Sequence, residues 1–234
     1  MLRKNIYKKQ INHSQSNIAD LIWKMLDRID RGDTSGWNLV GHSTGGRTAE
    51  AMTLERPYHT KSLVLVDAEF FGNTAELNHG EPSILKIPAV KEFYDELQKD
   101  KLITFEDMGH FLNSGYGRKP DTSDVTGHLM PMIIPGTAGA IESVFSNCSE
   151  KQVLDAAALK GIPVMAIWGT LDKWIPARSA SKIKKYARHP EIRKIKGAAN
   201  MPMETNAIEF NSILVEFLNR NNKGVRSWEL GVGD

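Results

Sequence analysis

The spacing of hydrophobic residues along the chain predicts helices and strands in alternation. Residues 17–30 carry apolar side chains at steps of three and one, which places these side chains on one face of a helix. Residues 62–67 form a continuous apolar run, which is typical of a parallel strand covered on both faces. The pattern also predicts strands at 37–41, 162–168 and 192–195, and helices at 44–56, 149–159, 176–187 and 204–220. Strands that alternate with helices indicate an α/β fold with a parallel sheet of about four strands.

The middle of the chain has a different texture. Glycine and proline recur throughout residues 72–148, between short helical stretches at 87–98 and 138–145. We therefore expect an inserted helical region there rather than further sheet. The expected organisation is 1–71 for the first part of the α/β core, 72–148 for the insertion, 149–220 for the rest of the core and 221–234 for a polar tail.

Composition narrows the functional classes. A length of 234 residues suits one large domain, or one domain with an insertion. A hydrophobic content of 41% excludes wholesale disorder, and a net charge of +2 gives no reason to expect a nucleic-acid or membrane-surface partner. No apolar run is long enough to predict a transmembrane helix. The single cysteine, Cys148, excludes a disulfide framework, so the cytoplasm is the expected compartment.

The chemistry is concentrated in a G-x-S-x-G motif with an apolar strand before it and a helix after it. The residues of this elbow are Gly41, His42, Ser43, Thr44, Gly45 and Gly46. Such a turn holds the serine in a strained conformation and exposes its hydroxyl above the carboxyl end of the strand. Gly41 and Gly45 are expected to leave room where side chains would clash with neighbouring backbone. The N–H group of Thr44, at the helix start, is a candidate donor to an oxyanion.

With these features the sequence resembles the α/β-hydrolase superfamily, especially its esterase-like and carbon–carbon-hydrolase-like members with a helical cap. The resemblance covers most of residues 14–220. Residues 168–176 are similar to the family's W-G-x-x-D-x-x-x-P segment, in which the aspartate is the acid of the catalytic triad. The resemblance implies that Ser43 is the nucleophile and Asp172 the acid. Asp67 ends a neighbouring strand, where some members place the acid, and is the alternative.

One departure from the family removes the general base. Residues 197–204 resemble the family's G-x-G-H-x-P-x-E segment, but Asn200 stands in the histidine position. An amide cannot take the proton of Ser43 near neutral pH, so the serine would be a poor nucleophile. Among the seven histidines, His110 in the insertion is the candidate substitute base. His42 is expected to point away from Ser43.

A second departure lies before the elbow. Family members have further strands there, and a loop that supplies the second oxyanion donor, whereas residues 1–36 contain one helix and no obvious strand. The elbow strand would then form an exposed sheet edge, which is a template for association. We therefore predict a homodimer in which two copies of residues 37–41 pair about a two-fold axis to give one continuous sheet. In the alternative, the N-terminal residues cover this edge.

Two functional interpretations remain. The first is a serine hydrolase of ester or similar acyl substrates, which uses Ser43 and Asp172 and whose turnover is impaired by Asn200 and the missing loop. The second is a catalytically inactive hydrolase-fold protein that binds a small apolar ligand or a protein partner. The sequence holds no metal or nucleotide motif, so no cofactor is expected.

Overall fold

The core of the molecule is a parallel four-stranded sheet in a computed structural model that describes residues 14–29, 36–69, 83–99, 102–146, 159 and 161–222. The strands are β1 (Trp37–His42), β2 (Thr60–Val66), β3 (Val164–Gly169) and β4 (Glu191–Ile195), in the spatial order β1-β2-β3-β4. Leu39 pairs with Leu63, and Val64 pairs with Met165. Within the described residues β1 has a neighbour on one side only, so the elbow strand lies at a sheet edge as the sequence predicts.

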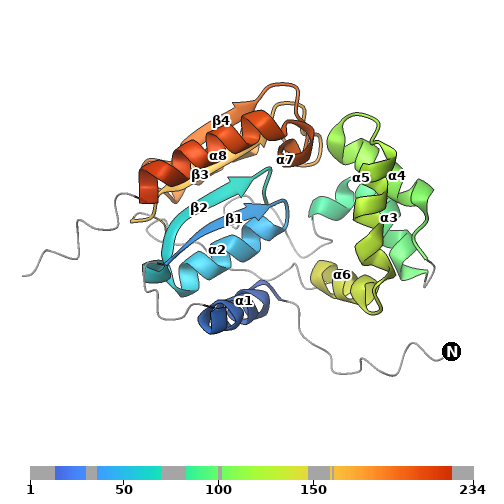
Figure 1. The fold of residues 1–234 in the computed structure, drawn as a ribbon, viewed down its shortest axis with the longest axis horizontal. Coiled ribbons are helices and arrows are strands. Elements are labelled where there is room, and N and C mark those ends of the chain that lie inside the picture. The colour runs from blue at the N-terminus through green and yellow to red at the C-terminus, as the bar shows by residue number, and fades with distance from the viewer. Residues whose placement is uncertain are drawn as a thin grey trace, which may run out of the picture.

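Helices cover both faces of this sheet (Figure 1). Helix α2 (Gly45–Glu55) packs on one face and α1 (Gln15–Ile29) packs beside it, whereas α8 (Ala207–Asn222) covers the other face. Successive strand side chains therefore enter two different cores. Leu65 and Ala166 face the α2 side, while Val66 and Ile167 face Phe217 of α8. Burial on both sides explains the continuous apolar runs of β2 and β3.

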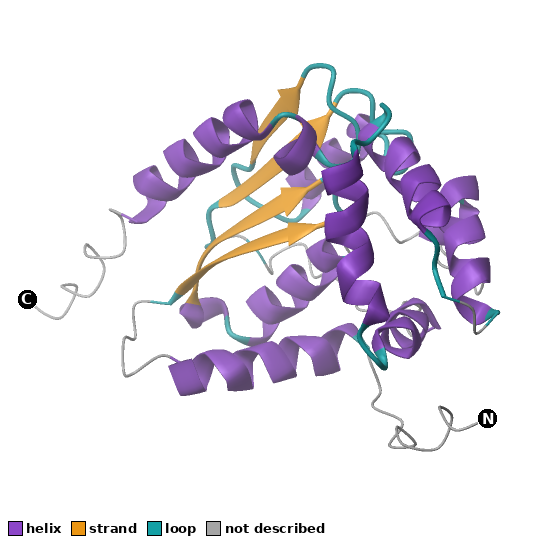
Figure 2. Ribbon diagram, turned by 45° about the vertical axis from the view of Figure 1, so that its right-hand side comes forward, coloured by secondary structure: helices purple, strands orange, loops and turns teal. Residues whose placement is uncertain are grey.

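The inserted segment forms a group of short helices at the carboxyl ends of the strands (Figures 1 and 2). They are the 3₁₀ turn η3 (Ser83–Lys86), α3 (Pro88–Gln98), α4 (Phe105–Tyr116), α5 (Thr122–Leu129), the 3₁₀ turn η4 (Met130–Ile133) and α6 (Thr137–Ser146). Capping boxes begin α4 at Thr104 and α5 at Asp121. The ring centroids of Phe93 and Phe111 are 4.7 Å apart, which joins α3 to α4. The expectation of helix rather than sheet in this part is confirmed for its described residues.

Several element boundaries differ from the sequence prediction. The helix expected at 176–187 is the 3₁₀ helix η5 (Ala177–Lys185). Its buried residues Ala180 and Ile183 are three positions apart, which suits a helix with three residues per turn. The helix expected at 204–220 is divided into α7 (Pro202–Thr205) and α8. Only residue 159 of the helix predicted at 149–159 lies within the described residues, and the predicted tail lies outside them after residue 222. No helix of the described part is long and apolar enough to cross a membrane.

Candidate active site

The turn between β1 and α2 holds Ser43 in a strained backbone conformation. Its φ is +52°, in the left-handed region that side chains other than glycine rarely adopt. Hydrogen bonds on both sides fix this conformation, because the Ser43 N–H donates to Val66 O at 3.1 Å and the Ser43 carbonyl accepts from Gly46 N–H at 3.1 Å. Such strain persists only where the surroundings hold it, and it is typical of functional positions.

Close approach of the backbones explains two of the elbow glycines. A Cβ atom at Gly41 would lie 2.5 Å from the carbonyl oxygen of Gly45, and one at Gly46 would lie 2.5 Å from Cβ of Ala68. The expectation of crowding at Gly45 is wrong, because a Cβ atom there would meet nothing within 4 Å. Gly46 rather than Gly45 therefore lets α2 approach the turn after β2.

Thr44 precedes the first residue of α2, and its amide makes no hydrogen bond within the described part of the chain. The amide groups of a first helical turn lack partners in the helix and sit at the positive end of the helix dipole. This N–H group has no partner among the described residues, and its role as an oxyanion donor stays a prediction.

Asp172 follows β3 and is held by three N–H donors. Its Oδ1 accepts hydrogen bonds from the backbone N–H of Trp174 at 2.7 Å and of Ile175 at 3.0 Å. Its Oδ2 accepts from Nδ2 of Asn200 at 3.0 Å. Burial raises the pKa of Asp172, and these hydrogen bonds oppose the shift because they stabilise the carboxylate. The carboxyl group is therefore oriented toward Asn200.

Asn200 is 1% exposed and is fixed through its backbone as well as its side chain. Its N–H donates to the carbonyl oxygen of Gly115 at 3.0 Å, and its own carbonyl is 2.8 Å from Nε2 of His42. A Cβ atom at Gly169 would lie 2.0 Å from the carbonyl oxygen of Ala199, so this glycine lets the Asn200 loop reach the end of β3. Asn200 Oδ1 is buried and has no partner at hydrogen-bond distance among the described residues.

His42 has a structural partner that the sequence did not suggest. Its ring contacts Asn200, and burial lowers the pKa of His42, so the ring is neutral near pH 7. A neutral ring donates its Nε2–H to the carbonyl of Asn200 and helps to hold this loop against the elbow.

Asp67 lies beside Asp172 rather than in place of it. It is fully buried, has a φ of +40°, and its Oδ1 accepts the N–H of Gly169 at 2.9 Å. Burial, followed by the charge of Asp172, raises the pKa of Asp67 to about 10. The two candidate acids of the sequence are thus neighbours, and burial raises the pKa of both.

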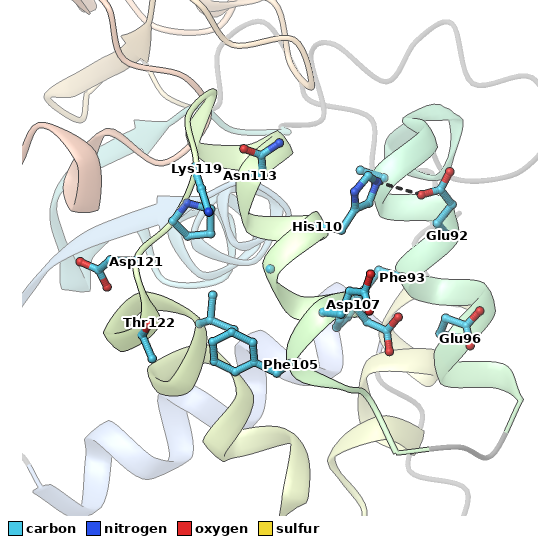
Figure 3. A pocket seen from close by; sticks show the side chains of 15 residues that line it. Glu92, Phe93, Glu96, Phe105, Asp107, His110, Asn113, Lys119, Asp121 and Thr122 are labelled. Atoms are coloured by element: carbon cyan, nitrogen blue, oxygen red, sulfur yellow. Dashed lines mark ion pairs between the residues drawn. The ribbon is translucent and has the colours of Figure 1, made fainter.

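His110 is separated from this group. Its side chain is 63% exposed, and its Nε2 is 3.1 Å from Oε2 of Glu92 (Figure 3). It lines a cavity of about 1080 Å³ on the helical region, together with Phe105, and one of about 540 Å³ between this region and the segment after β3, together with Lys173. None of Ser43, Asp172 and Asn200 lines either cavity. The structure therefore does not bring His110 together with the serine.

A second polar cluster ties the helical region to this site. Tyr116 of α4 donates its hydroxyl to Oε2 of Glu204, and Nε2 of His128 in α5 lies 2.9 Å from the same oxygen. The Glu204 carboxylate raises the pKa of His128, and His128 in turn holds the pKa of Glu204 low. Glu204 is the last residue of the 197–204 segment, so its position could have marked it, whereas nothing in the spacing of residues indicates Tyr116 or His128.

The comparisons with known proteins concern the family and the fold. The family model of the alpha/beta hydrolase fold matches residues 8–206. Among curated protein sequences, none matches the chain. Several solved structures share the fold at sequence identities too low to indicate a common activity.

One is the meta-cleavage product hydrolase CumD from Pseudomonas fluorescens IP01, with a TM-score of 0.70, 16% identity, and coverage of 92% of this chain and 75% of that one. The hydrolase BphD from Rhodococcus sp. strain RHA1 gives a TM-score of 0.69 at 15% identity, covering 91% and 75%. An epoxide hydrolase from Bacillus megaterium gives 0.66 at 18% identity, covering 89% and 77%.

Proposed function

The chain belongs to the α/β-hydrolase superfamily, and on this premise we propose that it is a serine hydrolase of ester or similar acyl substrates with impaired turnover. Ser43 is the proposed nucleophile, the Thr44 N–H the proposed oxyanion donor and Asp172 the proposed acid. The observation that carries the proposal is the hydrogen bond of 3.0 Å from Asn200 Nδ2 to Asp172 Oδ2. The Asn200 carbonyl also contacts His42, the residue before Ser43, whose φ is +52°. Residues 72–148 are the proposed cap over this site.

The same hydrogen bond explains why turnover would be impaired. In a catalytic triad the acid accepts an N–H from the base, and the other nitrogen of the base takes the proton of the serine. Asn200 donates to Asp172 in the same way, but its amide has no basic atom to offer Ser43. Loss of one triad member typically costs roughly 10⁴ to 10⁶ in rate.

The missing base also favours a second candidate function. A hydrolase fold without its base can retain a ligand site, and the alternative is an inactive protein that binds a small apolar ligand or a protein partner. The proposed partner of the hydrolase is a small acyl substrate, and that of the inactive protein is a small apolar ligand or another protein; neither is a nucleic acid. The proposed compartment is the cytoplasm.

Reaction with a fluorophosphonate probe separates the two candidates. The probe phosphonylates an activated serine, so the intact mass is measured after incubation of the unmodified protein, Ser43→Ala and Ser123→Ala. Ser123 is an exposed serine of α5 that bonds Asp121, and it serves as the matched control. A single adduct that only Ser43→Ala loses supports the serine hydrolase. No adduct contradicts it in favour of the binding protein, and an adduct that persists in Ser43→Ala excludes Ser43 as the nucleophile.

We further propose that two copies associate through the β1 edge. Two features support this: β1 lies at the end of the described sheet, and its Val40 side chain is 46% exposed. Coverage of the edge by the N-terminal residues of the same chain is the competing arrangement.

A further inference from the structure

The two strained residues of the described chain stand at the ends of neighbouring strands. Ser43 and Asp67 are its non-glycine residues with positive φ, at +52° and +40°. His42 pairs with Val66, so each strained residue directly follows the last paired position of its strand. The turn after β2 is also bonded to the elbow, because Glu69 N–H donates to Ser43 O at 3.0 Å. Asp67 is therefore fixed in the same turn system as the serine.

The carboxyl group of Asp67 is enclosed but incompletely bonded. Its side chain is fully buried, and Oδ1 accepts one hydrogen bond, from the N–H of Gly169 at 2.9 Å. Its Oδ2 is buried and accepts no hydrogen bond from any N–H or O–H group in the described part of the chain. The group that interacts with it there is the carboxyl of Asp172. A buried anion with an unsatisfied oxygen beside a second anion is strongly unfavourable.

The hydrogen bonds of the pair show which carboxyl keeps the charge. Asp172 accepts from Trp174, Ile175 and Asn200, and each donor stabilises the ionised form. Within the described residues, Asp67 accepts from Gly169 alone. When two neighbouring carboxyls share a single negative charge, the charge resides on the one with more donors, so the proton resides on Asp67.

We propose that Asp67 is a positioning residue that stays protonated near neutral pH and donates its Oδ2–H to Asp172. The inference rests on the proposed function, because it takes Asp172 as the acid of the Ser43 site. The proton gives Asp172 a fourth donor, fixes the carboxylate toward Asn200, and leaves one negative charge on the pair. The raised pKa of Asp67 agrees with this arrangement.

Infrared spectroscopy tests the protonation directly. A protonated carboxyl has a carbonyl stretch that a carboxylate lacks, and ¹³C-labelled aspartate assigns the band to this residue type. At neutral pH we expect the band in the unmodified protein and in the control Glu69→Gln, which neutralises another buried carboxyl two positions away. We expect Asp67→Asn to lose it. A band that Asp67→Asn retains, or no band in the unmodified protein, overturns the proposal.

The pH dependence of unfolding provides a second readout. An aspartate in the unfolded chain ionises near pH 3.9, whereas native Asp67 keeps its proton to about pH 10, so unfolding releases a proton between these values. The unfolding constant of the unmodified protein, divided by that of Asp67→Asn, should therefore rise by up to about tenfold per pH unit from about pH 5 to about pH 9. Asp67→Asn retains a donor to Asp172 and an acceptor for Gly169, whereas Asp67→Ala loses both and should be less stable than Asp67→Asn throughout. A ratio that does not change with pH contradicts the proposal.

The outcome remains decisive if Asp67→Asn does not fold. In the unmodified protein the carbonyl band should then persist to about pH 8 and be lost as the pH rises through about 10, and its loss below about pH 8 overturns the proposal. Failure of this inference is distinguishable from failure of the proposed function, because neither readout uses the serine probe. Labelled Ser43 without the band refutes the shared proton alone, and the band without labelling refutes the hydrolase alone.

Discussion

Asn200 performs one of the two tasks that a histidine performs at its position. Its Nδ2 donates to Asp172 at 3.0 Å, as a histidine nitrogen would, and its backbone is bonded to Gly115 and His42. Its Oδ1 has no hydrogen-bond partner among the described residues, and an amide oxygen is a very weak base. The loop is therefore in place for a base that the side chain does not supply.

Restoring the histidine tests this interpretation. In Asn200→His, one ring nitrogen should donate to Asp172 and the other should take the proton of Ser43. We expect the rate of fluorophosphonate labelling at Ser43 to rise by roughly 10²–10⁴-fold, the usual contribution of a general base. The rate should also increase with pH as the imidazole loses its proton.

The matched control for this restoration is Asn113→His, which adds a histidine on the exposed surface of α4 and should leave the labelling rate unchanged. If Asn200→His folds and labels no faster than the unmodified protein, the missing base is not what limits Ser43.

At the scale of elements, periodicity predicts those parts of the fold that burial alone determines. The runs of β2 and β3 are buried on both faces, and their sequence patterns are correspondingly continuous. Local hydrogen bonding, which apolar spacing does not encode, determines the 3₁₀ form of η5 and the break between α7 and α8. At this break the Thr205 hydroxyl donates to the carbonyl oxygen of Met201 at 3.1 Å. Element type was therefore more predictable than element boundaries.

Some residues of the candidate site were likewise predictable from the sequence, and others were not. Short motifs around Ser43, Asp172 and Asn200 mark residues that lie close to their neighbours in sequence, and they are sufficient to identify these three. The partners supplied by the helical region are not marked, because Gly115 meets Asn200 through packing between segments 85 positions apart. The same holds for the contact of His42 with the Asn200 loop, 158 positions away.

One contact between elements should respond to pH. The Glu204 carboxylate raises the pKa of His128. The contribution of His128 to stability is therefore full at pH values below the ordinary pKa of histidine, and it is lost as the pH rises through the raised pKa. His128 lowers the pKa of Glu204, so the contribution of Glu204 to stability is lost as the pH falls through this lowered pKa. Among the described residues, the charged groups around the cluster are Asp124 and Arg118, and the buried His42 ring is a further titratable neighbour. The link between α4–α5 and α7 should therefore be strongest in mildly acidic solution.

Hydrogen exchange of the α4 and α5 amides measures this link. We expect protection, corrected for intrinsic exchange, to fall as the pH rises through the raised pKa of His128, and we expect His128→Gln to abolish that fall. The effect should be modest because the pair is partly exposed, with side-chain exposures of 35% and 37%. His110→Gln is the control, since His110 pairs with Glu92 within the helical region. Equal pH dependence in His128→Gln and the unmodified protein would show that the pair does not join the elements.

At the scale of the whole molecule, the β1 end carries two apolar features. Leu21, Met25 and Ile29 recur at steps of four on α1 and are 53%, 51% and 58% exposed, and Val40 on β1 is 46% exposed. Both views place α1 beside α2 at this end of the molecule (Figures 1 and 2). A sheet edge flanked by exposed apolar side chains favours association with another chain.

Light scattering coupled to size-exclusion chromatography tests the proposed dimer. At micromolar concentration we expect twice the mass of one chain, and Val40→Lys or Met25→Glu should shift the equilibrium to the monomer, because a charge at a sheet edge or in an apolar contact opposes pairing. Val215→Lys places the same charge on α8, at a valine that is 52% exposed, and should leave the dimer intact. A monomeric unmodified protein contradicts association through this edge. Removal of residues 1–13 then distinguishes the competing arrangement, since the truncated chain should dimerise if those residues cover β1.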